Sequence, residues 1–161
     1  MQRTPLINGP LLLLSCRWVP YIRALNNHIL DRRFRVPHET QVLRKSFLTH
    51  ADAARFAVGA SYRTANYAAT STLRDPNHAA LANVGRLPLE VLWRITVPAN
   101  CLNACDCSRV AVFAAEAEVL LVPYTAFEVT DITRVGNLTT IWARVYQDNL
   151  TAPEDLPTRA A

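Results

Sequence analysis

The segment Leu89–Val97 constrains the fold more than any other, because its pattern fits a β-strand along its whole length. Its odd-numbered residues are all apolar, and Glu90, Arg94 and Thr96 stand among the residues between them. Since side chains two residues apart share one face of a strand, the apolar face must pack against a core. Similar patterns predict strands over 116–122, 126–135 and 139–146, with a turn at 123–125.

The first half of the chain has a more helical pattern. A helix is predicted to begin at Pro20, a residue that suits the first helical position, and apolar residues recur at helical spacing up to Leu30. The other predicted elements are an exposed connector over 32–38, a strand at 41–44, a helix or loop over 49–60, a strand over 63–72, a short helix over 76–84 and a loop over 101–115. Helices in the first half and strands in the second predict an α+β fold.

The composition is that of a single globular domain. The chain has 161 residues, 50% of them hydrophobic and 19% charged, which is enough apolar matter for a core. We expect an N-terminal extension over 1–19, one domain over 20–150 and a flexible tail over 151–161. Only 4 glycines are present, and neither G-x-G-x-x-G nor G-x-x-x-x-G-K-[ST] occurs. Any nucleotide must therefore be held without a glycine-rich phosphate loop.

The net charge of +4 comes from scattered arginines, with Lys45 the single lysine among 17 basic residues. No basic patch with interleaved aromatic residues is present, so we expect no nucleic-acid partner. The apolar run Pro10–Cys16 ends in Leu-Leu-Ser-Cys and resembles a short signal or lipid-attachment segment. It is much shorter than the roughly 20 residues of a membrane-spanning helix. We expect no transmembrane span, and the localisation stays open between the cytoplasm and secretion.

Three of the 4 cysteines cluster in Cys-Leu-Asn-Ala-Cys-Asp-Cys, at positions 101, 105 and 107. The spacing differs from the usual C-x-x-C pair of zinc sites, and no histidine follows nearby. We expect small buried or reduced thiols and no bound metal, although the sequence leaves open whether they are reduced, paired or metal-bound.

Glu116 and Glu118 are the candidate reactive carboxylates. They stand two residues apart at the start of a predicted strand, so both are expected on one face of it. Two carboxylates in different environments can perform different acid–base tasks. On spacing alone, the pair is more typical of the solvent-exposed edge of a strand.

The whole segment from Glu116 to Val129 reads E-A-E-V-L-L-V-P-Y-T-A-F-E-V. It resembles the E-x-E-V-L-L-P-P-x-T-x-F-x-V signature of arginine-type mono-ADP-ribosyltransferases, with Val122 in place of one proline. That family uses an arginine, a serine and a glutamate in chain order. Its arginine closes a strand written V-Y-R-G, and the similar segment here is Val-Leu-Arg44-Lys45, with lysine for glycine.

The family's middle motif is an aromatic residue followed by S-T-S, and this chain has Tyr67 followed by Thr70-Ser71-Thr72. The resemblance therefore spans roughly residues 21–146. It implies an ADP-ribosyltransferase-like α+β fold of two small, packed, mainly antiparallel sheets with N-terminal helices. It also implies that the chain is an enzyme that takes NAD⁺ as substrate, needs no metal and modifies a protein with an exposed arginine.

The resemblance assigns roles to the matched residues. Glu118 would stabilise the positive charge that develops on the ribose when the nicotinamide bond breaks. Arg44 would grip the pyrophosphate or the nearby ribose through its bidentate fork. Ser71, Thr70 and Thr72 would shape the NAD⁺ pocket, with Ser71 hydrogen-bonding Glu118.

Two further residues would serve the acceptor. Glu116 would orient the acceptor guanidinium and help to deprotonate it, and Phe113 would stack on the guanidinium plane. A core position for Phe113 is equally compatible with the sequence. The alternatives to protein-arginine transfer are NAD⁺ hydrolysis, a catalytically inactive binding module of the same fold, and an unrelated small β-rich interaction domain.

Overall fold

The computed structural model describes residues 31–72, 89–108, 117–136 and 138–159, together with Ala24, Asn27 and Ile29. The short helical elements are η1 (Arg32–Phe34), a 3-10 turn, and α2 (His50–Ala53). The strands are β1 (Thr40–Leu48), β2 (Ser61–Thr64), β3 (Ala68–Ser71), β4 (Leu89–Val97), β5 (Ala104–Asp106), β6 (Glu118–Leu121), β7 (Ala126–Val135), β8 (Leu138–Val145) and β9 (Thr158–Arg159).

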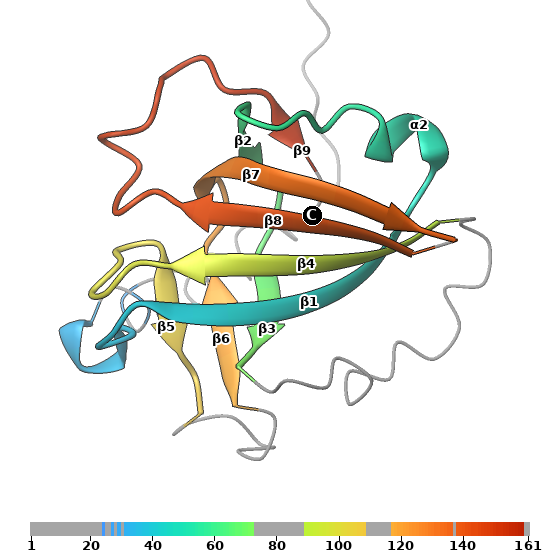
Figure 1. Cartoon of the computed structure of the whole chain (residues 1–161). Helices are drawn as coiled ribbons and strands as arrows, with labels where there is room; N and C mark the ends of the chain where they lie inside the picture. The colour runs from blue at the N-terminus through green and yellow to red at the C-terminus, as the bar shows by residue number, and fades with distance from the viewer. Residues whose placement is uncertain are drawn as a thin grey trace, which may run out of the picture.

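Within these described residues the nine strands form one continuous sheet, in the order β5-β6-β3-β1-β4-β8-β7-β2-β9. The neighbouring strands are antiparallel except for the parallel pairs β4–β8 and β2–β9. Figure 1 shows β1, β4, β8 and β7 side by side, while β3, β6 and β5 run across them in a second layer. The sheet is therefore curled, so that its two halves pack on each other.

Strand β4 confirms the prediction for Leu89–Val97, since all of its odd-numbered residues are buried and those between them are partly exposed. Trp93 is fully buried at its centre and meets the rings of Phe56 and Phe127 edge-on, at centroid distances of 5.0 and 5.9 Å. Its indole Nε1 donates to Ser46 Oγ at 2.9 Å. This bond satisfies the one polar group that the side chain carries into the core.

The corner of the curled sheet lies between β1 and β3. β1 is paired with β4 along its whole length, from Thr40 to Leu48. Toward β3 it has one register pair, Leu43 opposite Ser71. The two strands diverge beyond this pair, which lets the second half of the sheet fold over the first half and close the core.

The architecture corrects the predicted fold class in two respects. The two predicted small sheets are one curled sheet, and helix is scarce in the described part of the chain. Of the predicted helix from Pro20, the described residues Ala24, Asn27 and Ile29 are helical, and the rest lies outside the described residues. The helix predicted over 76–84 lies outside them as well. No helix in the described ranges is long and apolar enough to cross a membrane.

Several predicted elements have different bounds in the structure. The single strand predicted over 63–72 is wrong, because β2 and β3 join distant parts of the sheet and the chain must cross between them at 65–67. The segment predicted as a helix or loop over 49–60 is one helical turn followed by turns and loop, and the turn is capped by Thr49 Oγ1, which accepts from the N–H of Asp52. Part of the predicted loop 101–115 is strand β5. The segment predicted as a tail contributes β9, parallel to β2.

The Trp93–Ser46 bond gives a stability prediction. Replacement of Ser46 by alanine removes the acceptor and leaves a buried indole N–H unpaired, which costs about 1–3 kcal/mol. Urea unfolding of Ser46→Ala, followed by circular dichroism, is expected to show this loss. In a Trp93→Phe background the same substitution should cost much less. An equal cost in both backgrounds would show that Ser46 acts through packing alone.

Candidate active site

Ser71 and Glu118 are brought face to face by the pairing of β3 with β6. The N–H of Thr72 donates to the carbonyl of Ala117 at 3.1 Å, and the carbonyl of Glu118 accepts from Cys107 on the other side. Hydrogen-bonded pairs alternate along an antiparallel ladder, so Ser71 and Glu118 form a non-hydrogen-bonded pair. In such a pair the side chains stand on one face with their Cβ atoms about 4.5–5.5 Å apart. Both residues are half-buried.

Arg44 lies at the same corner, one residue along β1 from the Leu43 partner of Ser71. By strand alternation its side chain leaves β1 on the same face as the buried Val42, whereas Leu43 and its partner Ser71 carry their side chains on the other face. Its Nη1 donates to the carbonyl of Ala69 on β3 at 2.8 Å. Burial lowers the pKa of Arg44 from its ordinary value, and an arginine nevertheless keeps its charge in proteins. The guanidinium therefore ties β1 to β3 while it places a cation at the corner.

Thr70 and Thr72 flank Ser71 but have other partners. Thr70 is buried, and its hydroxyl donates to the carbonyl of Val119 at 2.6 Å. The Thr72 hydroxyl donates to the carbonyl of Ala117 at 3.4 Å. Of the three hydroxyls, that of Ser71 belongs to the residue paired with Glu118. The cofactor-binding role expected for the two threonines stays a prediction.

The backbone before Glu118 departs from the predicted strand. β6 begins at Glu118, and Ala117 has a φ of 45°, in the left-handed region that residues other than glycine rarely adopt. The alternation that was expected to place Glu116 and Glu118 on one face therefore does not extend through Ala117. Such strain costs on the order of 1–3 kcal/mol and clusters at functional sites. Glu116 and Phe113 lie outside the described residues.

Lys45, the departure from the family's glycine, is accounted for by an ion pair. Its Nζ lies 2.7 Å from Glu90 Oε1 on the neighbouring strand β4. By alternation Lys45 leaves β1 on the face opposite to that of Arg44. The lysine therefore has an ion-pair partner on the face that Leu43 and Ser71 also use.

Cys107 is the site neighbour that the sequence analysis missed. Its N–H donates to the carbonyl of Glu118 at 2.9 Å, which continues the β5–β6 register by one residue. Cys107, Glu118 and Ser71 thus form a row across three adjacent strands. The signal in the sequence is the two-residue spacing of Cys105 and Cys107, which puts both thiols on one face once the segment is a strand.

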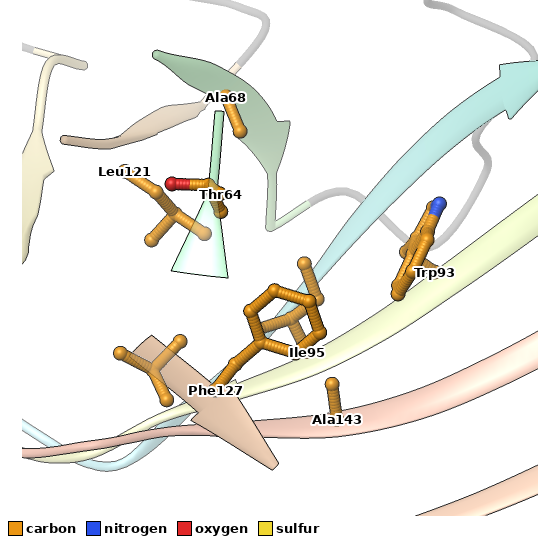
Figure 2. Close-up of a pocket in the computed structure, with 8 residues that line it drawn as sticks. Thr64, Ala68, Trp93, Ile95, Leu121, Phe127 and Ala143 are labelled. Atoms are coloured by element: carbon orange, nitrogen blue, oxygen red, sulfur yellow. The ribbon is translucent and has the colours of Figure 1, made fainter. Parts of the chain in front are cut away.

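The cavity between the two layers is separate from this corner. It measures about 10 Å³, close to the least that a water molecule needs, and its wall is apolar apart from Thr64. Figure 2 shows its lining, which comes from both halves of the sheet: Thr64, Ala68, Trp93, Ile95, Leu121, Phe127, Ala143 and Val145. It is a packing gap in the core and contains none of the candidate residues. Among the described residues, no group of three histidine, cysteine or carboxylate side chains could hold a metal ion.

Comparison with known proteins gives matches at the level of structure. No protein-family model matches the chain, and no curated protein sequence matches it. The ADP-ribosyltransferase Vis of Vibrio splendidus, in complex with agmatine, superimposes with a TM-score of 0.61 at 18% identity. The match covers 78% of this chain and 56% of the Vis chain.

Two further solved structures are similar. HopU1 of Pseudomonas syringae pv. tomato matches with a TM-score of 0.53 at 16% identity, over 67% of this chain and 45% of its own. The C3 exoenzyme of Clostridium limosum matches with a TM-score of 0.52 at 16% identity, over 70% of this chain and 62% of its own. This chain therefore has an ADP-ribosyltransferase-like fold and spans about half to three fifths of these proteins.

The different burial of Thr70 and Ser71 leads to a stability prediction. Thr70→Val removes a buried hydroxyl that donates across the β3–β6 ladder, and is expected to lower the free energy of unfolding by about 0.5–1.5 kcal/mol. Ser71→Ala removes a half-buried hydroxyl and should lower it by less than Thr70→Val does, because water reaches the groups around a half-buried position. Chemical unfolding of both variants tests this. A larger loss for Ser71→Ala would mean that Ser71 supplies the structural hydroxyl.

Proposed function

We propose that this chain transfers ADP-ribose from NAD⁺ to an acceptor and releases nicotinamide. The observation that carries the proposal is the Ser71–Glu118 pair, which stands on one face at the corner of an ADP-ribosyltransferase-like fold. The pair gives the fold a carboxylate with a hydroxyl directly beside it. These are the groups that the resemblance assigns to the breaking of the nicotinamide bond.

Glu118 acts on the developing cation. As the bond between nicotinamide and ribose breaks, positive charge builds up on the ribose, and a carboxylate that accepts from the 2′-hydroxyl stabilises it. The half-buried position of Glu118 keeps the carboxylate accessible to substrate yet partly shielded from water. In this proposal the Ser71 hydroxyl, on the opposite residue of the ladder, donates to the carboxylate and orients it.

Arg44 contributes a charge that does not depend on pH in the physiological range. Its bond to the Ala69 carbonyl holds β1 against β3, so that the guanidinium is fixed relative to Ser71. In this proposal Arg44 meets the pyrophosphate or the nearby ribose of NAD⁺. A fixed fork would serve in place of the missing glycine-rich loop.

The proposed acceptor is the guanidinium of a protein arginine. The E-x-E spacing of Glu116 and Glu118 supports it, and so does the Vis structure, which contains agmatine, a small molecule with the guanidinium group of arginine. In this proposal Glu116 orients and deprotonates the guanidinium, and Phe113 stacks on it. NAD⁺ hydrolysis, in which water replaces the acceptor, needs Glu118 and not Glu116.

A catalytically inactive module of the same fold is the second candidate, because the chain departs from the family pattern at Lys45 and Thr70. Both departures have structural partners. Lys45 forms an ion pair with Glu90, and the Thr70 hydroxyl donates to the Val119 carbonyl. Release of nicotinamide from NAD⁺ by the purified chain distinguishes the two candidates.

Glu118→Gln is expected to reduce nicotinamide release by about 100–1,000-fold. The amide keeps the size of the side chain but removes the charge that stabilises the transition state. Glu128→Gln is the matched control, because Glu128 lies on β7 in the other half of the sheet, opposite Arg144, and should leave the rate unchanged. Wild-type release by a folded Glu118→Gln protein would disprove the catalytic assignment.

Glu116→Gln is expected to separate transfer from hydrolysis. An amide cannot accept the guanidinium proton, so labelling of agmatine should fall by about 100-fold or more. Water needs less activation once the ribose cation has formed, and slow nicotinamide release should persist. Both rates are measured on the same preparation. Equal losses would make Glu116 a structural or NAD⁺-binding residue, and no loss would exclude arginine-type transfer.

A further inference from the structure

Two thiols lie beside Glu118 and are not used by the proposed reaction. The Sγ atoms of Cys105 and Cys107 are 3.9 Å apart, and neither cysteine is in a disulfide. Cys107 is partly exposed, and Cys105 is buried. Because Cys107 is opposite Glu118 in the β5–β6 ladder, its side chain stands on the same face as the candidate carboxylate.

The two thiols differ in the way that a reacting and a resolving thiol do. The pKa of Cys107 is lowered, chiefly because the Cys105 thiol can hydrogen-bond to its thiolate, against the effects of burial and of the Glu118 charge. The pKa of Cys105 is raised by the same hydrogen bond and by burial. Thiols that sense oxidants are typically accessible, ionise readily and lie next to a second thiol.

The backbone spacing permits a disulfide between them. Residues two apart on a strand have Cα atoms about 6.4–6.8 Å apart, at the upper end of the range that a disulfide can bridge. The bond would therefore have to shorten this part of the strand. A disulfide under such tension is easily reduced again, which is typical of regulatory rather than structural bonds.

Contraction at Cys107 would act on Glu118. The N–H of Cys107 holds the Glu118 carbonyl at 2.9 Å, so a shift of the Cys107 main chain displaces the residue that carries the carboxylate. Small displacements of a reacting group lower rates strongly, because catalysis requires near-contact geometry. Ala117, in its left-handed conformation, immediately precedes Glu118, and its carbonyl accepts from the N–H of Thr72.

We propose that Cys105 and Cys107 form a dithiol that hydroperoxides oxidise to a disulfide, and that this disulfide switches off the site at Glu118. The effect on activity rests on the proposed function. In the first step the Cys107 thiolate attacks a peroxide oxygen, the O–O bond breaks, and a sulfenic acid and an alcohol or water form. In the second step the Cys105 sulfur attacks the Cys107 sulfur and forms the S–S bond. The S–O bond of the sulfenic acid breaks, and its hydroxyl leaves as water together with the proton of the Cys105 thiol.

The first experiment detects the disulfide itself. The full chain carrying Cys16→Ser is treated with hydrogen peroxide, and its remaining free thiols are blocked with an alkylating reagent. The protein is then digested, and the peptide masses are measured by mass spectrometry. We expect a peptide that contains both cysteines, lacks two hydrogens and is restored by dithiothreitol. Cys101, which is buried and whose Sγ is bonded to the Tyr146 carbonyl, should be alkylated as a free thiol after unfolding.

A trivalent arsenical provides a second measurement, because phenylarsine oxide binds tightly when two thiols reach one arsenic atom. One equivalent should bind the reduced Cys16→Ser chain, and neither Cys105→Ser nor Cys107→Ser should bind it. Cys101→Ala is the matched control and should still bind. If the chain neither forms the disulfide nor binds the arsenical, the proposal that Cys105 and Cys107 form a reactive dithiol is wrong.

The effect on activity is measured as nicotinamide release before and after peroxide, with each variant compared with its own untreated sample. Oxidation should lower the rate of the Cys16→Ser chain by about 10–100-fold, reversibly, and should not change that of Cys107→Ser. A disulfide that forms without loss of rate would overturn the switch. A reduced chain with no activity would count against the proposed function, while the disulfide and arsenical results would still decide the dithiol.

Discussion

The corner between β1 and β3 is the constraint on which the rest of the structure depends. The single register pair Leu43–Ser71, reinforced by the bond from Arg44 to the Ala69 carbonyl, is the place where the sheet turns from one layer into the other. The turn closes the core around Trp93 and brings β6 alongside β3. The same turn keeps Ser71 opposite Glu118 and brings Arg44 to the Ala69 carbonyl of β3, while the Arg44 side chain leaves its strand on the face opposite to that of Leu43 and Ser71.

Several residues of the Glu116–Val129 signature belong to the core. Val119, Leu121, Thr125, Phe127 and Val129 are all buried, and the Thr125 hydroxyl donates to the Val122 carbonyl at 2.6 Å within the turn that joins β6 to β7. The motif therefore specifies two strands that leave the turn for different halves of the sheet. Within the described part of this motif, Glu118 is the residue that the fold leaves half-exposed beside Ser71.

The surroundings of Glu118 are more strained and more reactive than its sequence shows. Ala117 enters β6 in a left-handed conformation, Ser71 lies on one side of Glu118, and Cys107 lies on the other. In this arrangement β3 supplies Ser71 to the proposed transfer reaction. The proposed oxidation of Cys107, next to the end of β5, would act on the same carboxylate.

Alternating apolar side chains made strands such as β4 and β8 readable from the sequence, and the resemblance to arginine-type mono-ADP-ribosyltransferases identified Glu118, Ser71 and Arg44 as candidates. Alternation reports the faces of a strand because that property is local. Tertiary structure alone decided which strands are neighbours, since pairing depends on contacts between distant segments. For this reason the break between β2 and β3, the placement of Arg44 one residue out of phase with Ser71, and the position of Cys107 opposite Glu118 appeared only with the fold.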